Sequence, residues 1–214
     1  MPAPTVARLP VYRRALDALL GSDPDAVSSA EIARLTGVNA ATVRRDLSWL
    51  GSYGTRGTGY DPRQLLDRVE RELSLDREWP IAVVGVGNLG RALAGSGMFA
   101  SRGFRVAALI DVDPRIVGTA VGGIEVEHAD DLARIVRREA IAFAVLATSS
   151  DAAQGMAERL AGEGVRAILN FAPVRIRLSG GVRIHNVDLA AELQVLAFYG
   201  ARTTPGGPAR AAPG

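Results

Sequence analysis

The segment from residue 81 to residue 111 constrains the fold of this chain more than any other. An apolar strand, Ile81–Val84, runs into Gly85, Gly87 and Gly90, which have the spacing G-x-G-x-x-G. In a nucleotide-binding strand–turn–helix unit, the first glycine permits the tight turn, the second lets a pyrophosphate approach the backbone, and the third lets the helix pack against the sheet. The amides at the start of that helix face the phosphate charge. The segment therefore predicts the first half of a dinucleotide-binding domain.

An acidic residue stands where such a domain would bind a ribose. Residues 106–110 predict a second apolar strand, and Asp111 follows it, 21 positions after Gly90. Its carboxylate can accept both hydroxyls of an adenosine ribose and would repel a 2′-phosphate, which favours NAD(H) over NADP(H). Two alternatives stay open. The glycines could serve only a tight turn, or the domain could hold another adenine nucleotide, such as coenzyme A or FAD.

The composition narrows the possible classes. With 214 residues, 48% of them hydrophobic, the chain can build one large domain or two small ones. It has no apolar run long enough to span a membrane and no signal-peptide core, so we expect a cytoplasmic protein without membrane contacts. It contains no cysteine, and its two histidines are His128 and His185, so we expect no metal site. A formal net charge of +2 does not by itself call for nucleic acid.

The N-terminal part predicts three short helices. Residues 10–20 have apolar positions at helical spacing, with Pro10 in the first turn. Ser28 and Glu31 have capping-box spacing at the start of a second helix, and Asn39 can cap a third. Two short helices joined by a glycine-containing turn predict a helix-turn-helix motif.

The third helix has the features of a DNA-recognition helix. Val43, Leu47 and Leu50 form one apolar face. The rest of its surface carries hydroxyl and arginine side chains, which can bond bases or phosphates in the major groove. The candidate DNA-binding residues on this helix are Thr42, Arg44, Arg45 and Ser48. The alternative is a solvated arginine face on an ordinary three-helix domain, and the helix alone does not decide between the two.

The segment that follows, residues 51–60, favours DNA binding. It reads G-S-Y-G-T-R-G-T-G-Y, which predicts a two-stranded turn, or wing, with Arg56 at its tip. An arginine on a narrow tip can enter the minor groove, whose negative potential attracts it. The candidate DNA-binding residues of the wing are Tyr53, Thr55, Arg56, Gly57 and Tyr60. A flexible linker is the alternative, but a linker does not need tyrosine and arginine at these spacings.

Beyond the first nucleotide-binding unit, strands and helices continue to alternate. Residues 141–147, 165–170 and 182–187 predict strands, whereas residues 130–138 and 151–162 predict helices. Alternation of this kind predicts a parallel sheet of the Rossmann type, with ligands at the carboxyl ends of its strands.

Polar residues follow two of these strands. Thr148–Ser150 can cap the next helix, which is the favoured role, or face a ligand. The segment Asn170–Pro173 lies at the carboxyl end of the next strand, where ligands of open α/β sheets bind. His185 is expected to be a partly buried strand residue, and His128 a surface residue.

The last predicted helix spans residues 188–199 and carries more apolar surface than one buried face needs. Leu189, Leu193, Leu196 and Ala197 form one apolar face, while Val195 and Phe198 lie off it. This pattern predicts that the helix is buried on two sides, and we expect packing across a homodimer to cover the additional apolar surface. We expect the tail after residue 200 to be disordered.

Five motifs occur in order along the chain. They are R-R-D-L-S-W-L-G-S-Y-G-T-R-G-T-G-Y, G-V-G-N-L-G, D-V-D-P, N-F-A-P and N-V-D-L, and together they extend over roughly residues 8–199. This arrangement resembles the Rex family, bacterial NADH-sensing transcriptional repressors. The resemblance implies an α/β protein with an N-terminal winged-helix domain, a Rossmann-like parallel sheet and a domain-swapped C-terminal helix. It also implies a homodimer on palindromic operator DNA, with NADH weakening DNA binding and NAD+ competing for the site.

The expected organisation follows from this resemblance. Residues 1–78 would form the winged-helix domain, residues 79–186 the NAD(H)-binding domain, residues 187–200 the dimerisation helix and residues 201–214 a disordered tail. The expected cofactor-binding residues are Gly85, Val86, Gly87, Asn88, Leu89, Gly90, Asp111, Val112, Thr148, Asn170, Phe171, Ala172, Pro173 and Leu189.

The resemblance also implies roles in DNA contact and in switching. Arg44, Arg45 and Arg56 match DNA-contacting positions of the family. Arg14 and Asp188 match an ion pair linked to the switch, although an aspartate there is also an ordinary helix N-cap.

One position departs from the family pattern. The family often has a tyrosine in a Y-P-G-F or Y-G-G-F stretch, where this chain has G-S-G-M-F at residues 95–99. Ser96 takes the place of the tyrosine and is too short to pair with the aspartate in the same way. Either the switch uses other contacts, or the response to NADH is altered.

Two other functions compete with a repressor. An NAD-dependent dehydrogenase would need a substrate domain and a histidine, cysteine or lysine placed for proton transfer, and the sequence offers neither. A coenzyme A-binding module can have a similar fold, but Asp111 and the N-terminal winged helix argue against it. The sequence therefore favours a regulator over an enzyme.

Overall fold

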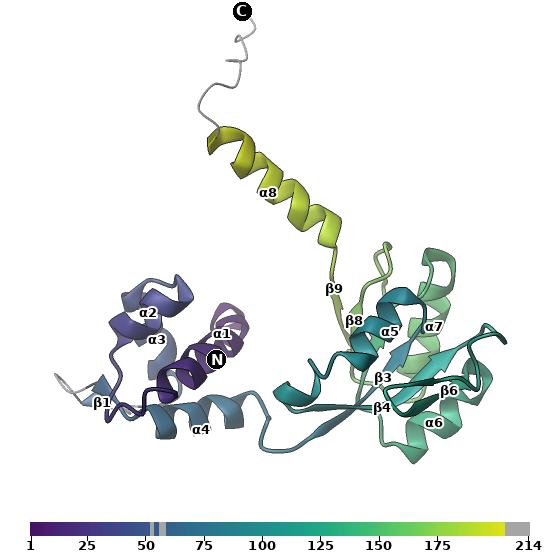
Figure 1. Cartoon of the computed structure of the whole chain (residues 1–214), viewed down its shortest axis with the longest axis horizontal. Coiled ribbons are helices and arrows are strands. Elements are labelled where there is room, and N and C mark those ends of the chain that lie inside the picture. The colour runs from purple at the N-terminus through teal and green to yellow at the C-terminus, as the bar shows by residue number, and fades with distance from the viewer. Residues whose placement is uncertain (52–53, 56–58, 204–214) are drawn as a thin grey trace, which may run out of the picture. The chain divides into compact units, whose positions relative to one another are not determined.

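The chain divides into two units, Met1–Glu78 and Trp79–Gly214. The computed structural model describes residues 1–51, 54–55 and 59–203 (Figure 1). The expected disordered tail begins inside the last helix, which continues to Thr203, and the rest of that tail lies outside the described residues.

The first unit is a group of helices with a short hairpin. Its elements are α1 (Ala3–Leu20), α2 (Ser29–Thr36), α3 (Ala40–Ser48), β1 (Gly54–Thr55), β2 (Gly59–Tyr60) and α4 (Pro62–Glu72). One apolar cluster joins the helices. Its buried members include Leu16, Ile32, Val43 and Leu65.

Helix α1 begins seven residues earlier than the sequence predicts. Pro10 therefore lies inside the helix rather than in its first turn, and that prediction was wrong. The added turns bury Thr5 and Leu9, which supply contacts that the apolar pattern from residue 10 onward did not reveal. Pro10 is itself exposed, so the backbone hydrogen bond that a proline cannot donate is lost on the solvent side of the helix.

The predicted caps of the next two helices are present. Ser28 and Glu31 form a capping box at α2, in which each residue bonds the backbone of the other. Gly37 ends α2 with a φ of 69°, a left-handed conformation that favours glycine. Asn39 then accepts a hydrogen bond from the amide of Ala41 at 2.8 Å and caps α3. These caps fix the helix-turn-helix geometry.

A hairpin follows α3 where the wing was predicted. Strands β1 and β2 are antiparallel, with Thr55 paired to Gly59. Tyr60 exchanges two backbone hydrogen bonds of 2.8 Å with Val27, which attaches the hairpin to the segment before α2. Gly59 has to be glycine there, because a side chain would lie 2.6 Å from the carbonyl oxygen of Val27.

A buried carboxylate joins α1 to α3. Asp46 is 1% exposed and accepts hydrogen bonds from Thr5 Oγ1 at 2.8 Å and Tyr12 Oη at 2.6 Å. The Arg8 guanidinium donates to both carboxylate oxygens, at 2.5 and 2.9 Å. Burial alone would raise the pKa of Asp46, but the bonds from Arg8, Tyr12 and Thr5 outweigh it and hold the pKa at about 2. The sequence analysis did not single out this residue.

The second unit is a sheet with helices on its faces. Its strands are β3 (Trp79–Val84), β4 (Phe104–Asp111), β5 (Ala120–Val121), β6 (Ile124–His128), β7 (Phe143–Leu146), β8 (Ala167–Asn170) and β9 (Arg183–Asn186). Its helices are α5 (Asn88–Gly95), α6 (Leu132–Arg138), α7 (Ser150–Gly162) and α8 (Leu189–Thr203). The strand order is β5-β6-β4-β3-β7-β8-β9, and every neighbouring pair is parallel except β5 and β6. This is the predicted Rossmann-type sheet.

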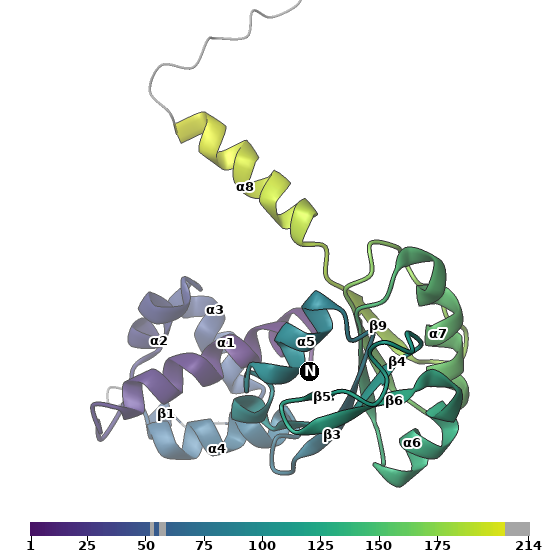
Figure 2. The same cartoon turned by 45° about the vertical axis from the view of Figure 1, so that its right-hand side comes forward.

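The two faces of the sheet are covered differently. Helices α6 and α7 cover one face (Figure 2). There Leu132, Ile135 and Leu160 pack against strand residues such as Ala82. Helix α5 covers part of the other face, next to β3 and β4. Leu169 and Phe171, at the carboxyl end of β8, share that second face and are only partly buried.

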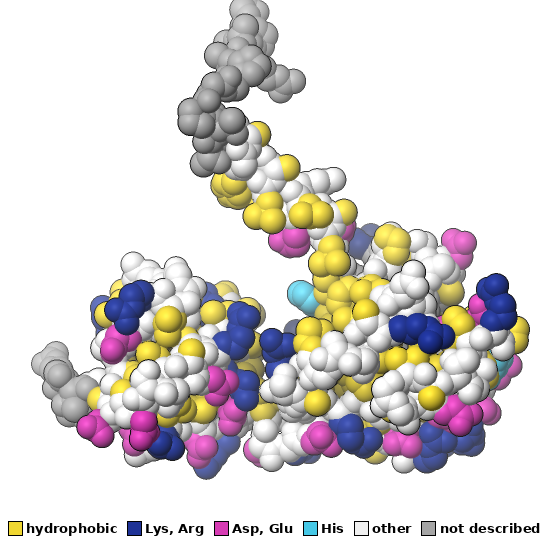
Figure 3. Space-filling view, in the orientation of Figure 1, with side chains coloured by type: hydrophobic (Ala, Val, Ile, Leu, Met, Phe, Trp, Pro, Cys, Tyr) yellow, Lys and Arg dark blue, Asp and Glu magenta, His cyan; other side chains and the backbone are white. Residues whose placement is uncertain are grey.

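Helix α8 contributes nothing to this core. Every side chain described from Leu189 to Ala201 is exposed, including several large apolar ones (Figure 3). Strand β9 before it is also open, so His185 is exposed rather than partly buried, and that prediction was wrong. Within the described part of the chain, no helix is long and apolar enough to cross a membrane.

The depressed pKa of Asp46 predicts an acid-sensitive stability. The folded-state pKa of about 2 lies below the ordinary value of 3.8, so the ionised carboxylate stabilises the fold above pH 4. That stabilisation, roughly 2 kcal/mol, disappears as the pH falls from 4 towards 2. We expect the free energy of unfolding of Asp46→Asn, measured by urea titration with circular dichroism, to fall less steeply over this range. Parallel curves for the two proteins would show that Asp46 is not the titrating group.

Candidate nucleotide site and nucleic-acid interface

The candidate nucleotide site is built where five strand ends form one row. Val84 is in register with Ile110 on one side and Leu146 on the other. Leu146 is in register with Asn170, and Asn170 with Asn186. The residues that follow these positions therefore lie along one edge of the sheet. This edge includes the point between β3 and β7 where the strand order reverses, which is where open α/β sheets bind ligands.

The three glycines after β3 do three different things. Gly85 has a φ of 89°, and a Cβ there would lie 2.6 Å from the carbonyl oxygen of Ala147. A Cβ at Gly90 would lie 1.9 Å from the carbonyl oxygen of Gly85, so helix and loop pack backbone to backbone. A Cβ at Gly87 would meet nothing within 4 Å. Gly87 is therefore dispensable for packing, and the space beside it is open to a ligand.

Asp111 holds the glycine loop. Its Oδ2 accepts a hydrogen bond from the amide of Val86 at 2.6 Å. Its Oδ1 accepts from the amides of Val112 at 2.7 Å and Asp113 at 2.9 Å. A carboxylate offers about four acceptor positions, so about one remains, on Oδ2. The expectation that Asp111 accepts both ribose hydroxyls therefore requires one of these amides to give up its bond.

An ion pair lies directly after Asp111 in the chain. Asp113 and Arg115 form a two-pronged ion pair, with Nη2 to Oδ2 at 2.7 Å and Nε to Oδ1 at 3.0 Å. The Arg115 guanidinium and backbone amide lower the pKa of Asp113 to about 2. Val112, between the two aspartates, is exposed. The segment after β4 therefore presents the Asp111 carboxylate, the Asp113–Arg115 ion pair and one exposed apolar side chain.

Thr148, after β7, has a buried hydroxyl without a partner. Within the described chain, its Oγ1 makes no hydrogen bond, and an unpaired buried polar atom costs about 1–3 kcal/mol. The backbone amide of Thr148 would lie 2.8 Å from a Cβ at Gly85, so this hydroxyl belongs to a residue that borders the glycine loop. Ser149 is the N-cap residue of α7, but its side chain makes no capping bond, so the favoured capping role is wrong for Ser149.

Asn170 shapes the loop after β8. It is 0% exposed, and its Nδ2 donates to the carbonyl of Val174 at 2.8 Å and to Asn186 Oδ1 at 2.9 Å. Its Oδ1 accepts from the amide of Ala172 at 3.0 Å. These bonds hold the side chain within the protein, and its expected contact with a ligand stays a prediction. Phe171 is half-buried and Pro173 is exposed, so surface at this edge comes from the loop that Asn170 holds.

The helix that follows the glycine loop places further residues at the site. Asn88 and Leu89 are exposed in its first turn, whereas Val86 is buried. Arg91, which the sequence analysis passed over, donates from Nε to the carbonyl of Val86 at 3.1 Å. This bond keeps a cation beside the loop that would hold a pyrophosphate. The sequence could have revealed this residue, because Arg91 directly follows the G-x-G-x-x-G motif.

His128, which the sequence analysis expected only to be a surface residue, lies on the strand next to Asp111. It is half-buried and in register with Asp111 on the adjacent strand, so the two side chains lie on the same face of the sheet. Its Nδ1 accepts from the amide of Asp130 at 3.2 Å, which leaves the Nε2 edge free to donate when the ring is neutral. The sequence could not show this, because the pairing of β4 with β6 is long-range.

The residues expected to act in switching belong to different parts of the chain. Arg14 is exposed on α1. Asp188 accepts a hydrogen bond from the amide of Ala191 at 3.0 Å, so it is the N-cap of α8, and Leu189 after it is exposed. The Ser96 hydroxyl donates to the carbonyl of Leu93 at 3.1 Å and ends α5, which is a local role.

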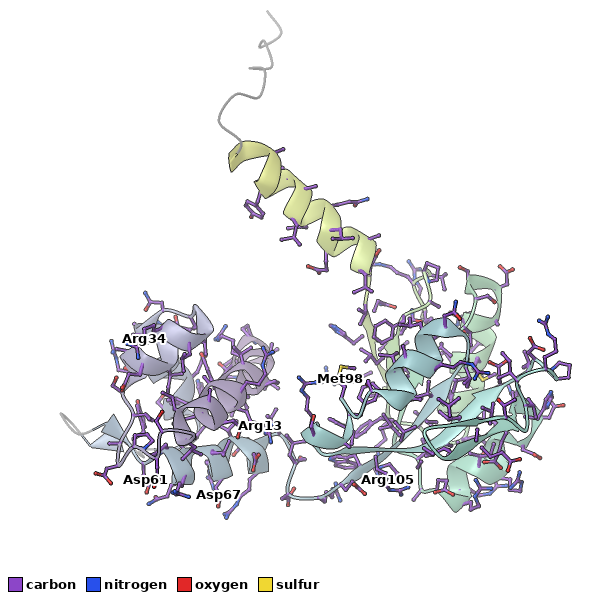
Figure 4. The ribbon with its side chains drawn as sticks, viewed as in Figure 1. Arg13, Arg34, Asp61, Asp67, Met98 and Arg105 are labelled. Atoms are coloured by element: carbon purple, nitrogen blue, oxygen red, sulfur yellow. The ribbon has the colours of Figure 1, made fainter. Side chains whose placement is uncertain are left out.

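In the first unit, α3 presents the expected polar face. Arg44, Arg45 and Ser48 are exposed, and Thr42 is half-buried. Arg44 also donates to Ser29 Oγ at 3.1 Å, which holds its guanidinium towards α2. Arg34 on α2 adds another exposed cation to this unit (Figure 4).

The wing residues can be placed only in part. Tyr53, Arg56 and Gly57 lie outside the described residues, and Thr55 is described only as part of β1. Tyr60 is half-buried against the apolar cluster of the unit. Its ring therefore anchors the hairpin, a role that the expectation of DNA contact did not include.

The residues at this edge of the sheet suit a dinucleotide better than a metal ion. The open space at Gly87, the unpaired hydroxyl of Thr148 and the acceptor position left on Asp111 suit a ligand with phosphates and hydroxyls. No cluster of metal-ligating side chains occurs in the ranges that the structure covers. An exposed arginine face on a helix-turn-helix unit, joined to such a site, defines a DNA-binding regulator controlled by a nucleotide.

Comparison with known proteins identifies the family. Residues 1–48 match the family described as "Putative DNA-binding protein N-terminus", and residues 76–174 match the family described as "CoA binding domain". The Redox-sensing transcriptional repressor Rex of Streptomyces griseus is 54% identical over 199 residues, which are 93% of this chain and 79% of that protein. The chain belongs to the Rex family of redox-sensing transcriptional repressors. This confirms the prediction of a regulator rather than an enzyme.

Solved structures agree over nearly the whole chain. The crystal structure of RSP in complex with β-NAD+ and operator DNA has a TM-score of 0.89 and 31% identity, covering 94% of this chain and 93% of that one. The crystal structure of RSP in complex with β-NADH has a TM-score of 0.85 and 30% identity, covering 94% and 95%. The predicted fold class, a helical DNA-binding part followed by a Rossmann-like parallel sheet, is confirmed.

The glycine loop predicts opposite outcomes for two alanine substitutions. Gly90→Ala would place a methyl group against the backbone of Gly85, and we expect it to lower the free energy of unfolding by roughly 3 kcal/mol. Gly87→Ala meets no neighbour, so we expect its melting temperature to match that of the wild type. Thermal unfolding followed by circular dichroism measures both. Equal losses of stability for the two variants would contradict the assignment of separate tasks to the two glycines.

Proposed function

We propose that this chain represses transcription by binding palindromic operator DNA as a homodimer, and that it leaves the DNA when NADH rises relative to NAD+. NAD+ and NADH are its regulatory ligands, and the cytoplasm is its expected location. The observation that carries the proposal is the similarity, over 94% of the chain, to a repressor crystallised with β-NAD+ and operator DNA. The glycine loop, Asp111 and the polar face of α3 support it.

The nucleotide site suits an adenine dinucleotide without a 2′-phosphate. The amides at the start of α5 and the Arg91 guanidinium provide positive potential at the glycine loop, where the pyrophosphate would lie. Gly87 lets that group approach the backbone. Asp111 would bind one ribose hydroxyl through Oδ2, and its carboxylate would repel an added phosphate. We therefore propose NAD(H) in preference to NADP(H).

Coenzyme A is the second candidate ligand, because the Rossmann part matches a family described as "CoA binding domain". The same adenosine and pyrophosphate contacts would serve it. The whole-chain similarity to Rex repressors favours NAD(H), and coenzyme A belongs in the test as a competing ligand.

NADH must be distinguished from NAD+ at the nicotinamide end, because the two share their adenosine half. A neutral dihydropyridine ring is easier to bury than a nicotinamide cation. The loop that Asn170 holds contains the exposed Pro173 next to Ala172, which is only 6% exposed, and α8 begins with the exposed Leu189. We propose that these residues form the apolar surface against which the nicotinamide packs. A hundredfold difference in affinity between two states corresponds to roughly 2.7 kcal/mol of coupling.

A second copy of the chain would complete the structure. Six large side chains of α8 are more than half exposed, namely Leu189, Leu193, Val195, Leu196, Phe198 and Tyr199. In the same unit, Leu169 and Phe171 leave part of one sheet face incompletely covered. An exposed apolar helix and an incompletely covered sheet face in one chain are complementary between two copies. We propose that α8 packs against the partner, in exchange with the partner's own α8.

The proposed switch is a shift between two arrangements of this dimer. In one arrangement the two α3 helices would lie about 34–36 Å apart, or a multiple of that distance, and meet successive major grooves. NADH would favour the other. Arg14 and Asp188 are proposed to take part through an ion pair, whereas Ser96 is committed to the end of α5 and would not take the role of the family tyrosine.

The direct test is fluorescence anisotropy on a labelled duplex that the wild-type protein has selected from a randomised library. We expect NADH at fixed salt to release the DNA, and NAD+, NADPH and coenzyme A each to release it at least tenfold less effectively, since only NADH satisfies the nicotinamide and ribose requirements. Gly87→Ala should keep DNA affinity and lose the response. Release by coenzyme A at lower concentration than NADH would overturn the ligand assignment, and failure to select any duplex would overturn the repressor assignment.

The dimer is tested by placing the same charge at adjacent positions of α8. Leu193→Glu would put a carboxylate on the apolar surface, and we expect it to shift analytical-ultracentrifugation mass from dimer to monomer, weakening association at least a hundredfold. Gln194→Glu adds an equal charge at the next, polar position and should leave the dimer intact. A dimer that withstands Leu193→Glu would show that α8 is not its interface.

A further inference from the structure

One buried group of the first unit has no part in the proposed switch. The carboxylate of Asp46, in the last turn of α3, accepts four hydrogen bonds of 2.5–2.9 Å. All four come from Thr5, Arg8 and Tyr12 on α1. These donors are spaced i, i+3 and i+7, so one face of α1 converges on a single side chain of the recognition helix.

Stability alone does not explain a carboxylate at this position. A buried ion pair is often no more stabilising than apolar side chains of similar volume, because desolvation offsets the attraction. Val43, Leu47 and Leu50 already supply apolar contact between α3 and the unit. Apolar contact is non-directional, whereas four short hydrogen bonds restrict both the rotation of α3 about its axis and its sliding along α1.

The position of Asp46 on α3 gives that restriction a consequence. Arg44 and Ser48 are each two residues away, about 200° around the helix, so they lie nearly opposite the buried carboxylate. Both are exposed, as is Arg45. Any rotation that Asp46 prevents would swing these side chains across the surface that faces DNA. A neighbouring face of α1, about 100° around the helix from Tyr12, is also held, because Arg13 donates to Glu70 of α4 at 2.8 Å.

We propose that Asp46 is a positioning residue for sequence-specific DNA recognition: it sets the rotation of α3 so that Arg44, Arg45 and Ser48 meet the bases, without touching DNA itself. This inference rests on the proposed repressor function. It also assigns Arg8 to Asp46 rather than to a phosphate, since both carboxylate oxygens engage its guanidinium.

The test separates positioning from stability by comparing two DNA affinities. One duplex is the sequence that the wild-type protein selects from a randomised library, and the other is the same duplex with its half-sites scrambled. Asp46→Asn frees the charge of Arg8 and loosens α3, so selected-duplex affinity should fall while scrambled-duplex affinity holds or rises. We expect the ratio of selected-duplex affinity to scrambled-duplex affinity to drop about tenfold, which corresponds to the cost of one misread base pair. Asp67→Asn, which breaks an exposed pair with Arg71 on α4, adds the same charge and should preserve the ratio.

Milder variants keep the test valid if Asp46→Asn does not fold. Thr5→Val and Tyr12→Phe each remove one donor and keep the shape of the side chain, and we expect each to lower the ratio by about threefold. Thr5→Ser restores the hydroxyl and should restore the ratio. Arg45→Ala is the contrasting case. Because it removes a cation that lies against DNA, it should lower affinity for both duplexes and reduce the salt dependence of binding by up to about one counterion, which none of the Asp46-cluster variants should do.

Each result either supports or overturns the positioning role of Asp46. A lower ratio in folded Asp46→Asn, or in Thr5→Val with rescue by Thr5→Ser, supports positioning. Equal losses on both duplexes, in step with a lower melting temperature, would show that the cluster serves stability only. An unchanged ratio in folded variants would also overturn the inference. If the wild-type protein selects no duplex, the proposed function fails instead, and the two failures are distinguishable.

Discussion

The parallel register around β3 is the constraint on which the nucleotide site depends. Because Val84 is paired with Ile110 and Leu146, the glycine loop, Asp111 and Thr148 all emerge at one edge of the sheet. The hydrogen bond from the Val86 amide to Asp111 then ties the loop to the neighbouring strand. The backbone contact between Gly90 and Gly85 leaves no room for a side chain. The loop is therefore held rigidly before any ligand arrives, which reduces the entropy that binding would cost.

The two units use buried polar groups for the same physical purpose. Asn170 holds the loop after β8 through backbone carbonyls and amides, and Asp46 holds α3 through three side chains of α1. In both cases directional bonds fix an element that carries the exposed surface next to it. Apolar clusters supply the bulk of the packing, but they do not select one orientation among similar ones. Thr148 is the exception, since its hydroxyl is buried and has no hydrogen-bond partner among the residues that the structure describes.

Much of the organisation could be predicted from local sequence. The capping box at Ser28 and Glu31 and the Asn39 cap are short-range signals, and both are present in the structure. The spacing of Gly85 and Gly90 encodes a backbone contact within one strand–turn–helix unit, which explains why that prediction held. Pro10 misled the prediction of α1, because local propensity does not reveal that Thr5 and Leu9 find buried partners elsewhere in the unit.

Local sequence patterns were enough to predict the alternation of strands and helices, the helix caps, the glycine loop and the excess of apolar residues in α8. Each of these is a pattern among neighbouring residues. The surroundings of Asp46, Asn170 and His128 follow from the fold and not from local sequence. Side chains of α1 bond to Asp46, Asn170 bonds to Asn186 of β9 as well as to its own loop, and His128 is in register with Asp111 of β4. A carboxylate or an amide looks the same in sequence whether it faces water, a ligand or a buried donor. The fold settles the matter, because a polar group that it removes from water must find its hydrogen bonds inside.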